Sequence, residues 1–196
     1  MAIYVGFGLY VTTNDGHTWS LLKAPVSHQE SQRVVWVSQS NPQLILLGST
    51  VGLYRSIDGG KTWQTDSLIN SGVSVIRSVP THPDTVYISS DAGIYRSNDG
   101  GKTFELVSAI VTNAAFSQLA VGYQNANILY GLVGQQVWSS TDGGKDWNQT
   151  SQLSTSYPMG LYVSPQNDQQ IYVGFYTPAE VIESTDGGKN WHLVAS

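Results

Sequence analysis

The chain has 196 residues, of which 40% are hydrophobic and only 12% charged, and it carries a formal net charge of −5. Five lysines and four arginines against fourteen acidic residues provide no basic face, so we expect no nucleic-acid partner. The sequence contains no apolar run of about 18 residues, so no membrane span is predicted. The absence of cysteine excludes disulfides and thiolate metal sites.

Short strands separated by turn residues are predicted along the whole chain, with no helix longer than one turn. Strand-like sequence begins at once, with no signal-peptide pattern before it, so we expect a soluble protein whose compartment is unknown. The second repeat shows a complete unit, with strands at 33–38, 44–48 and 53–56 and a fourth beginning at residue 63. Its second and third strands recur at 3–5 and 9–11, at 86–88 and 94–96, at 129–131 and 137–139, and at 171–173 and 181–183.

Five copies of one short motif follow the third strand of each unit, and their closing aromatic residues lie 44, 41, 43 and 44 residues apart. A period of about 40–45 residues with strand-like content is typical of a β-propeller with four antiparallel strands per blade. The sequence therefore predicts one all-β domain over residues 1–196. Its repeats span approximately 1–29, 30–70, 71–112, 113–155 and 156–196, and the first blade lacks its first strand.

Each motif combines a hydroxyl residue, an acid, glycines and an aromatic ring. The acid can accept backbone N–H bonds within the turn, glycine permits positive φ, and the ring anchors the loop by burying apolar area. We expect a structural role for the motif residues, which are Asn14, Trp19, Ser56, Asp58, Gly60, Trp63, Ser97, Asp99, Gly101, Phe104, Ser140, Asp142, Gly144, Trp147, Ser184, Asp186, Gly188 and Trp191.

These residues resemble the Asp-box, Ser-x-Asp-x-Gly-x-x-Trp, of the bacterial-neuraminidase-repeat (BNR) families. The first copy departs from it by placing Asn14 at the acidic position, and the third replaces Trp with Phe104. Proteins with such boxes include sialidases, xyloglucan-degrading glycosidases, the sorting receptor sortilin and a photosystem II assembly factor. The resemblance implies a propeller whose boxes lie on the rim, away from any active site, and it leaves the function open.

A sialidase-like site would need three converging arginines, a Tyr–Glu nucleophile pair and an acidic Asp. Arg55 and Arg96 occupy the same blade position and are interpreted as surface residues. Arg33 and Arg77 lie in first strands, nearest the propeller axis. Arg77 is the more interesting of the two, because the residues that the apolar pattern aligns with it in other first strands are apolar, namely Val35, Leu119 and Leu161.

Two aromatic residues of the first strands, Trp36 and Tyr162, are candidates for lining the central channel. Together with Arg33 and Arg77 they form the predicted ligand-binding set. No two carboxylates can be placed on one rim at glycosidase spacing, and the four histidines are scattered. No catalytic residue, metal ligand or cofactor is therefore predicted.

The leading interpretation is a non-catalytic binding or scaffolding propeller that binds a protein or a glycan. One alternative is a glycoside hydrolase, sialidase-like or glucanase-like, or a fragment of one. Another is an engineered or excised propeller segment that folds and self-assembles without further activity. The missing first strand leaves two arrangements open: a five-bladed ring with one three-stranded blade, or part of a larger ring completed by another copy.

Overall fold

The computed structural model describes residues 2–5, 8–23, 31–109, 115–153 and 157–195, and all of its regular elements are β-strands. They form five antiparallel sheets. The first has three strands, β1 (Ala2–Val5), β2 (Gly8–Val11) and β3 (Ser20–Leu22). The second contains β4 (Gln32–Val37), β5 (Ile45–Ser49), β6 (Leu53–Ser56) and β7 (Gln64–Thr65).

The remaining three sheets repeat this order. The third sheet contains β8 (Val73–Val79), β9 (His82–Ser90), β10 (Gly93–Ser97) and β11 (Glu105–Ala109). The fourth contains β12 (Gln118–Val121), β13 (Leu129–Val133), β14 (Gln136–Ser140) and β15 (Asn148–Gln152). The fifth contains β16 (Pro158–Ser164), β17 (Asn167–Phe175), β18 (Glu180–Ser184) and β19 (His192–Ala195). The predicted all-β class and the three-stranded first blade are confirmed.

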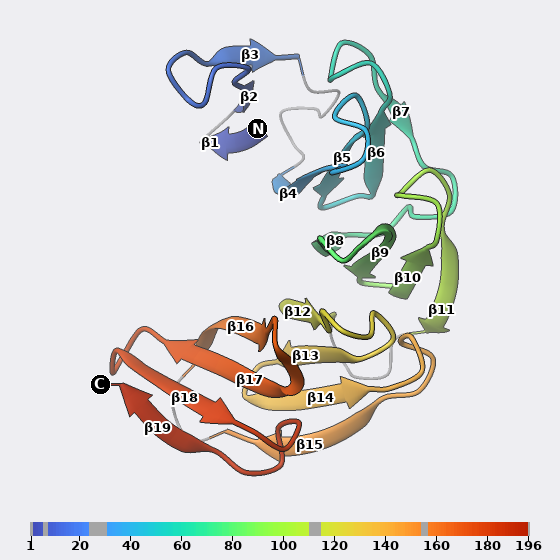
Figure 1. Cartoon of the computed structure of the whole chain (residues 1–196). Helices are drawn as coiled ribbons and strands as arrows, with labels where there is room; N and C mark the ends of the chain where they lie inside the picture. Colours follow the sequence, from blue (N-terminus) through green and yellow to red (C-terminus); the bar gives the residue numbers. More distant parts are fainter. Residues whose placement is uncertain (1, 6–7, 24–30, 110–114, 154–156, 196) are drawn as a thin grey trace.

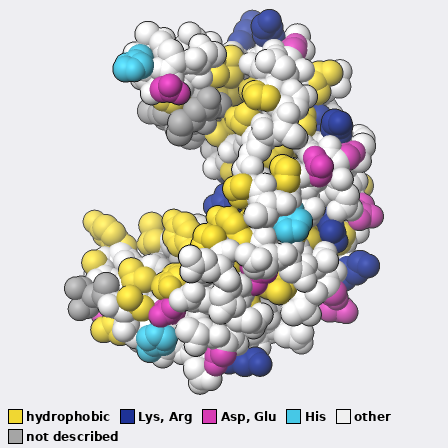
Figure 2. Space-filling view, in the orientation of Figure 1, with side chains coloured by type: hydrophobic (Ala, Val, Ile, Leu, Met, Phe, Trp, Pro, Cys, Tyr) yellow, Lys and Arg dark blue, Asp and Glu magenta, His cyan; other side chains and the backbone are white. Residues whose placement is uncertain are grey.

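The sheets stand side by side in an open arc. Strand β1 contacts β4, and the inner strands β4, β8, β12 and β16 contact one another in series. The first and fifth sheets lie on opposite sides of a wide opening (Figure 1), which stays hollow in the space-filling view (Figure 2). The arrangement is that of a propeller left open after five blades, so the closed five-bladed ring is not what the structure shows. The described part of the chain contains no helix that could cross a membrane.

The hydrophobic core consists of layers between neighbouring sheets. Strand β5 is buried along its whole length, because an apolar second strand faces a neighbouring sheet on each side. One cluster joins the second and third sheets, another the third and fourth, and another the fourth and fifth. In the last layer Val173 packs toward the fourth sheet, so its neighbour Tyr172 projects from the opposite face of the fifth sheet.

Each motif closes its hairpin through the same hydrogen bonds. In the second sheet the Ser56 hydroxyl donates to Asp58 Oδ1 and accepts the Gly60 N–H, both at 2.8 Å. Asp58 Oδ1 also accepts the Thr62 N–H at 2.9 Å. Gly59 and Gly60 have φ values of 74° and 89°, which are left-handed conformations that favour glycine. The predicted roles of the acid and the glycines agree with this geometry.

The closing tryptophans add a bond and an apolar anchor. The indole N–H groups of Trp63, Trp147 and Trp191 donate to the carbonyl of the second motif glycine at 3.0, 2.9 and 3.1 Å. Trp147 is 9% exposed and its ring lies 4.5 Å from that of Phe116, centroid to centroid. The hairpins therefore fasten the outer strands to the layered core.

Polar contacts also join consecutive sheets at fixed positions. The hydroxyl of Tyr87 in the third sheet donates to the Ala126 carbonyl of the fourth at 2.9 Å. The hydroxyl of Tyr130 in the fourth sheet donates to the Asp168 carbonyl of the fifth, also at 2.9 Å. Burial raises the pKa of both tyrosines to about 12, so these hydroxyls remain donors at neutral pH.

Candidate functional site

Strand register assigns Arg77 a different position from the one that the apolar pattern indicated. Arg77 pairs with Tyr87, whereas Ile76 pairs with Ile88. The equivalent pairs in the other sheets are Trp36 with Leu46, Ala120 with Tyr130 and Tyr162 with Tyr172. The alignment with Val35, Leu119 and Leu161 was therefore wrong by one residue. The pairing of β8 shifts register on both sides of this segment, an irregularity that alternation of apolar residues does not reveal.

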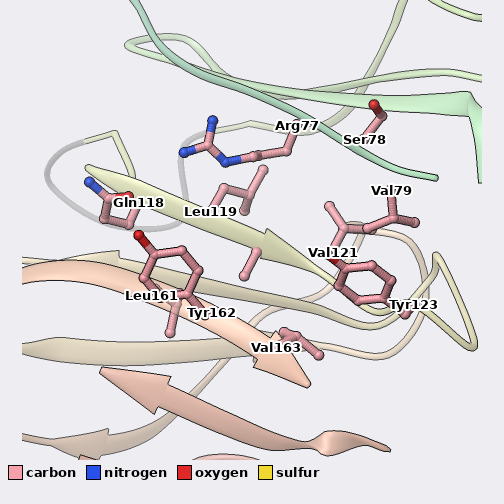
Figure 3. A pocket seen from close by; sticks show the side chains of 11 residues that line it. Arg77, Ser78, Val79, Gln118, Leu119, Val121, Tyr123, Leu161, Tyr162 and Val163 are labelled. Atoms are coloured by element: carbon pink, nitrogen blue, oxygen red, sulfur yellow. The ribbon is translucent and has the colours of Figure 1, made fainter. Parts of the chain in front are cut away.

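Three of the four predicted ligand-binding residues thus occupy one register position on successive inner strands. Trp36, Arg77 and Tyr162 share this position with Ala120 of β12. Arg77 and Tyr162 both line a pocket on the inner edge of β8, β12 and β16, as Figure 3 shows. The pocket volume is about 140 Å³, and its other lining residues are Ser78, Val79, Gln118, Leu119, Ala120, Val121, Tyr123, Leu161 and Val163.

Two small residues, Ala120 in the pocket lining and Gly160 next to Tyr162, adjoin the large side chains of the pocket. Ala120 separates Arg77 from Tyr162 and provides only a methyl group at the shared position. A Cβ on Gly160 would lie 2.9 Å from Tyr162 Cε2 and 3.5 Å from its hydroxyl oxygen, so the tyrosine ring lies across this glycine. The side chains of Arg77, Gln118 and Tyr162 point toward the same end of the pocket (Figure 3).

Arg77 is the charged group of this pocket. Its Nη1 donates to the Ile76 carbonyl at 3.0 Å, and no carboxylate is present among the residues that line the pocket. Arg77 is exposed as a whole residue, but desolvation by the neighbouring strands lowers the pKa of its guanidinium, while Tyr162 raises it, and the group stays charged at neutral pH. Tyr162 is 68% exposed. The pocket therefore presents a cation and polar donors above an apolar floor.

The other two predicted ligand residues lie elsewhere. The Trp36 indole donates to Ser78 Oγ at 3.0 Å and its ring packs near Gly101, so it joins the second and third sheets. Arg33 is exposed, and its Nη1 lies 3.0 Å from the point that a Cβ on Gly72 would occupy, near Asp91. Neither residue lines the pocket.

The remaining arginines are bound within their own sheets. Arg55 forms an ion pair with Asp66 at 2.7 Å. Arg96 donates to Asn98 Oδ1 at 2.9 Å and lies over the Tyr87 ring. All four arginines are in the described part of the chain, and of these only Arg77 lines the pocket. The three converging arginines of a sialidase are not assembled here.

Sequence reasoning missed Gln118, Ser78 and Tyr123 as pocket residues. Gln118 lies two residues before Ala120 on β12 and thus shares its face, a signal that the β-strand period offers once the inner face is known. Tyr123 follows the same strand in a turn, and no periodicity predicts its position. No group of three or more His, Asp or Glu side chains that could hold a metal occurs among the described residues.

Two family models match parts of the chain. The model of the Sortilin-Vps10 family, described as sortilin, neurotensin receptor 3, matches residues 7–130, which is more than half of the chain. The chain belongs to the Sortilin-Vps10 family. The BNR/Asp-box repeat model also matches residues 182–193, the fifth hairpin. The predicted Asp-box resemblance is therefore confirmed for this Sortilin-Vps10 family member, while no curated protein sequence matches it.

Solved structures of similar shape include enzymes and a peptide-binding protein. An ancestral GH74 enzyme is 20% identical with a TM-score of 0.77, and the GH74 xyloglucanase from Xanthomonas campestris is 19% identical with a TM-score of 0.71. They align with 95% and 96% of this chain, which spans 28% and 34% of their own lengths. YCF48 bound to D1 peptide is 15% identical with a TM-score of 0.69, and 96% of this chain covers 62% of it. At these identities the likeness shows the propeller fold.

Proposed function

We propose that the chain is a non-catalytic binding module that holds a carboxylate-bearing segment of a partner protein against Arg77. The observation that carries this proposal is the Arg77 guanidinium, which lines a pocket that has no acidic residue in its lining (Figure 3). Arg77 is exposed to solvent at the pocket, and hydrogen bonds from its guanidinium to a carboxylate are roughly twice as strong as those between neutral groups. Gln118 and Tyr162 provide further polar groups beside it.

The size and surroundings of the pocket favour a protein segment over a glycan chain. Its volume of about 140 Å³ suits one side chain or a chain terminus, whereas sites for larger ligands enclose about 300–1,000 Å³. Exposed Met159 lies on the same inner strand as Tyr162, and exposed Tyr157 directly precedes this strand. Hydrophobic side chains gather on the side of the opening formed by the last sheets of the arc (Figure 2). A short peptide with an acidic group flanked by apolar side chains fits this surface. YCF48, a structural neighbour, is solved bound to a peptide.

Glycoside hydrolysis is the second candidate, because GH74 enzymes are among the structural neighbours. Such chemistry requires two carboxyl groups about 5–10 Å apart across the scissile bond. The motif acids hold their own hairpins, and Asp168 accepts the backbone N–H groups of Gln124 and Asn125 at 3.1 and 2.8 Å. Since the pocket contains a cation and no lining carboxylate, binding is the better supported function.

A peptide-display selection on the folded chain tests the proposal, with the enriched peptides resynthesised in acidic and amide forms. We expect calorimetry to show binding of the acidic form only. Arg77→Gln should weaken it by about 10- to 100-fold, the loss of one charge-assisted contact. Arg33→Gln is the matched control, because it removes an exposed inner-strand arginine outside the pocket. Equal binding of acidic and amide peptides, or release of reducing sugar from xyloglucan, would overturn the proposal.

A further inference from the structure

Among the described residues, two surfaces on opposite sides of the opening have no neighbouring sheet packed on them, unlike the facing surfaces of the internal sheets. The first surface is the outer face of the fifth sheet, with Gln170, Tyr172, Glu183 and His192, which we call the strip. Tyr172, Glu183 and His192 are cross-strand partners on β17, β18 and β19. The strip faces away from the fourth sheet, and no described residue of another sheet covers it.

The strip repeats the positions that join the internal sheets. Tyr172 pairs with Glu183 as Tyr87 pairs with Arg96 and Tyr130 with Ser139. Tyr87 and Tyr130 are 0% and 2% exposed because the next sheet covers them. Tyr172 is only half-buried, and its hydroxyl donates to Glu183 Oε1 at 2.9 Å instead of to a carbonyl of a following sheet.

The second surface is the first hairpin, residues 12–19, whose internal counterparts pack against the preceding sheet. A Cβ on Gly101 would contact Leu46 and Trp36 of the preceding sheet. Of the described residues, one on Gly16 would contact only Trp19 of its own hairpin. Gly16 is half-buried, while its counterparts Gly60, Gly101, Gly144 and Gly188 are all buried. Trp19 is 38% exposed against 9% for Trp147.

We propose that the strip of one copy docks the first hairpin of a second copy, in the register that joins the internal sheets. The two surfaces are the two halves of an interface that this chain already forms between its own sheets. In the docked pair, Tyr172 takes the place that Tyr130 has in the contact between the fourth and fifth sheets. Asp15 of the second copy takes the place of Gly187, the first motif glycine of the fifth sheet. The contact is heterologous, so each added copy presents a fresh surface until the assembly closes into a ring.

Asp15 limits the strength of this contact. The other four hairpins have glycine at its position. A Cβ on Gly143 of the fourth sheet would lie 2.5 Å from Arg96 Nη1 of the third, and one on Gly187 of the fifth sheet would lie 3.3 Å from the Tyr130 hydroxyl of the fourth. In the docked register Asp15 therefore faces Glu183, the counterpart of Arg96, and the two carboxylates repel. The natural contact is consequently weak and strengthens when either carboxylate is removed.

Substitutions borrowed from other repeats test the register directly. Asp15→Gly installs the glycine of the other hairpins at a residue whose φ is 55°, which glycine accepts without strain. Glu183→Arg installs the residue found as Arg55 and Arg96 in the second and third sheets. We expect each variant to tighten self-association by on the order of tenfold in sedimentation velocity over a concentration series, since each removes a like-charge contact.

The double variant distinguishes docking from unrelated effects on either surface. If Asp15 faces Glu183, the two gains are coupled, because Glu183→Arg loses its ion-pair partner when Asp15 is absent. Tyr172→Phe should weaken association of the Asp15→Gly variant several-fold, while Tyr176→Phe, an exposed tyrosine outside the strip, should leave it unchanged. Monomeric behaviour of all variants, or independent gains, would overturn the proposal. Arg77 takes no part, so failure here leaves the proposed peptide site standing.

Discussion

The outer hairpins are nearly the same in every repeat, whereas one position of the inner strands differs in each. All five hairpins keep the same bonds from hydroxyl residue to acid or amide and to glycine N–H, including the first, where Thr12 and Asn14 replace Ser and Asp. At the shared inner position the residues are instead Trp36, Arg77, Ala120 and Tyr162. The hairpins therefore keep the same chemistry in every repeat, while the shared inner position differs from one repeat to the next.

The largest expected effect is the loss of a hairpin anchor. Trp147→Ala should reduce the free energy of unfolding by about 3–5 kcal/mol, because removing a buried aromatic ring loses its transfer free energy and also creates a cavity. Trp19→Ala, at a ring that is 38% exposed, should cost only about 1–2 kcal/mol. Urea unfolding measures both, and equal losses would show that the first hairpin is as well packed as the fourth.

Acid should weaken the hairpins in a defined pH range. The hydrogen bonds from Thr62 hold the pKa of Asp58 at about 2, below its ordinary value of 3.8. Burial raises the pKa of Asp99, but bonds from Thr103 and Ser97 outweigh it and lower the value to about 2. Because the unfolded chain binds protons first as the pH falls, the stability that these two carboxylates contribute is present above about pH 4 and is lost toward pH 2.

Variants at the same acids check the origin of this acid sensitivity. Asp58→Asn and Asp99→Asn introduce the residue that Asn14 supplies in the first hairpin, where it still accepts the Thr18 N–H at 2.9 Å. Thermal melts between pH 5 and pH 2 should therefore show a smaller decline for the double variant than for the natural chain. An unchanged decline would assign the acid sensitivity to other carboxylates.

The smallest expected effect separates the inner site from the fold. Gly160→Ala places a Cβ 2.9 Å from the Tyr162 ring, and this exposed ring can rotate away without disturbing the core. We expect peptide affinity to fall a few-fold with no measurable change in stability. Gly174→Ala is the matched control, because Gly174 pairs with Gly160 across β16 and β17 and no atom of the described residues lies within 4 Å of its Cβ position. Equal affinities for the two variants would exclude Tyr162 from the site.

The candidate site could be predicted only in part. Arg77 and Tyr162 were identified as inner-strand residues of unusual chemistry, and the structure brings them to one pocket. Trp36 has the same register, yet its indole is used between sheets because Ser78 provides an acceptor at 3.0 Å. The contributions of Gln118 and Ala120 depend on how far β12 stands from its neighbours, which no local pattern encodes.

The sequence by itself determined the repeat, the strands and the chemistry of each hairpin, because those bonds join residues at most four positions apart. Only the tertiary structure decided that Arg77 is the counterpart of Ala120 and Tyr162, since strand pairing and its irregularities set that register. It also decided that the five sheets form an open arc with two uncovered surfaces. The curvature of the arc comes from packing between sheets, a property that a single repeat does not possess.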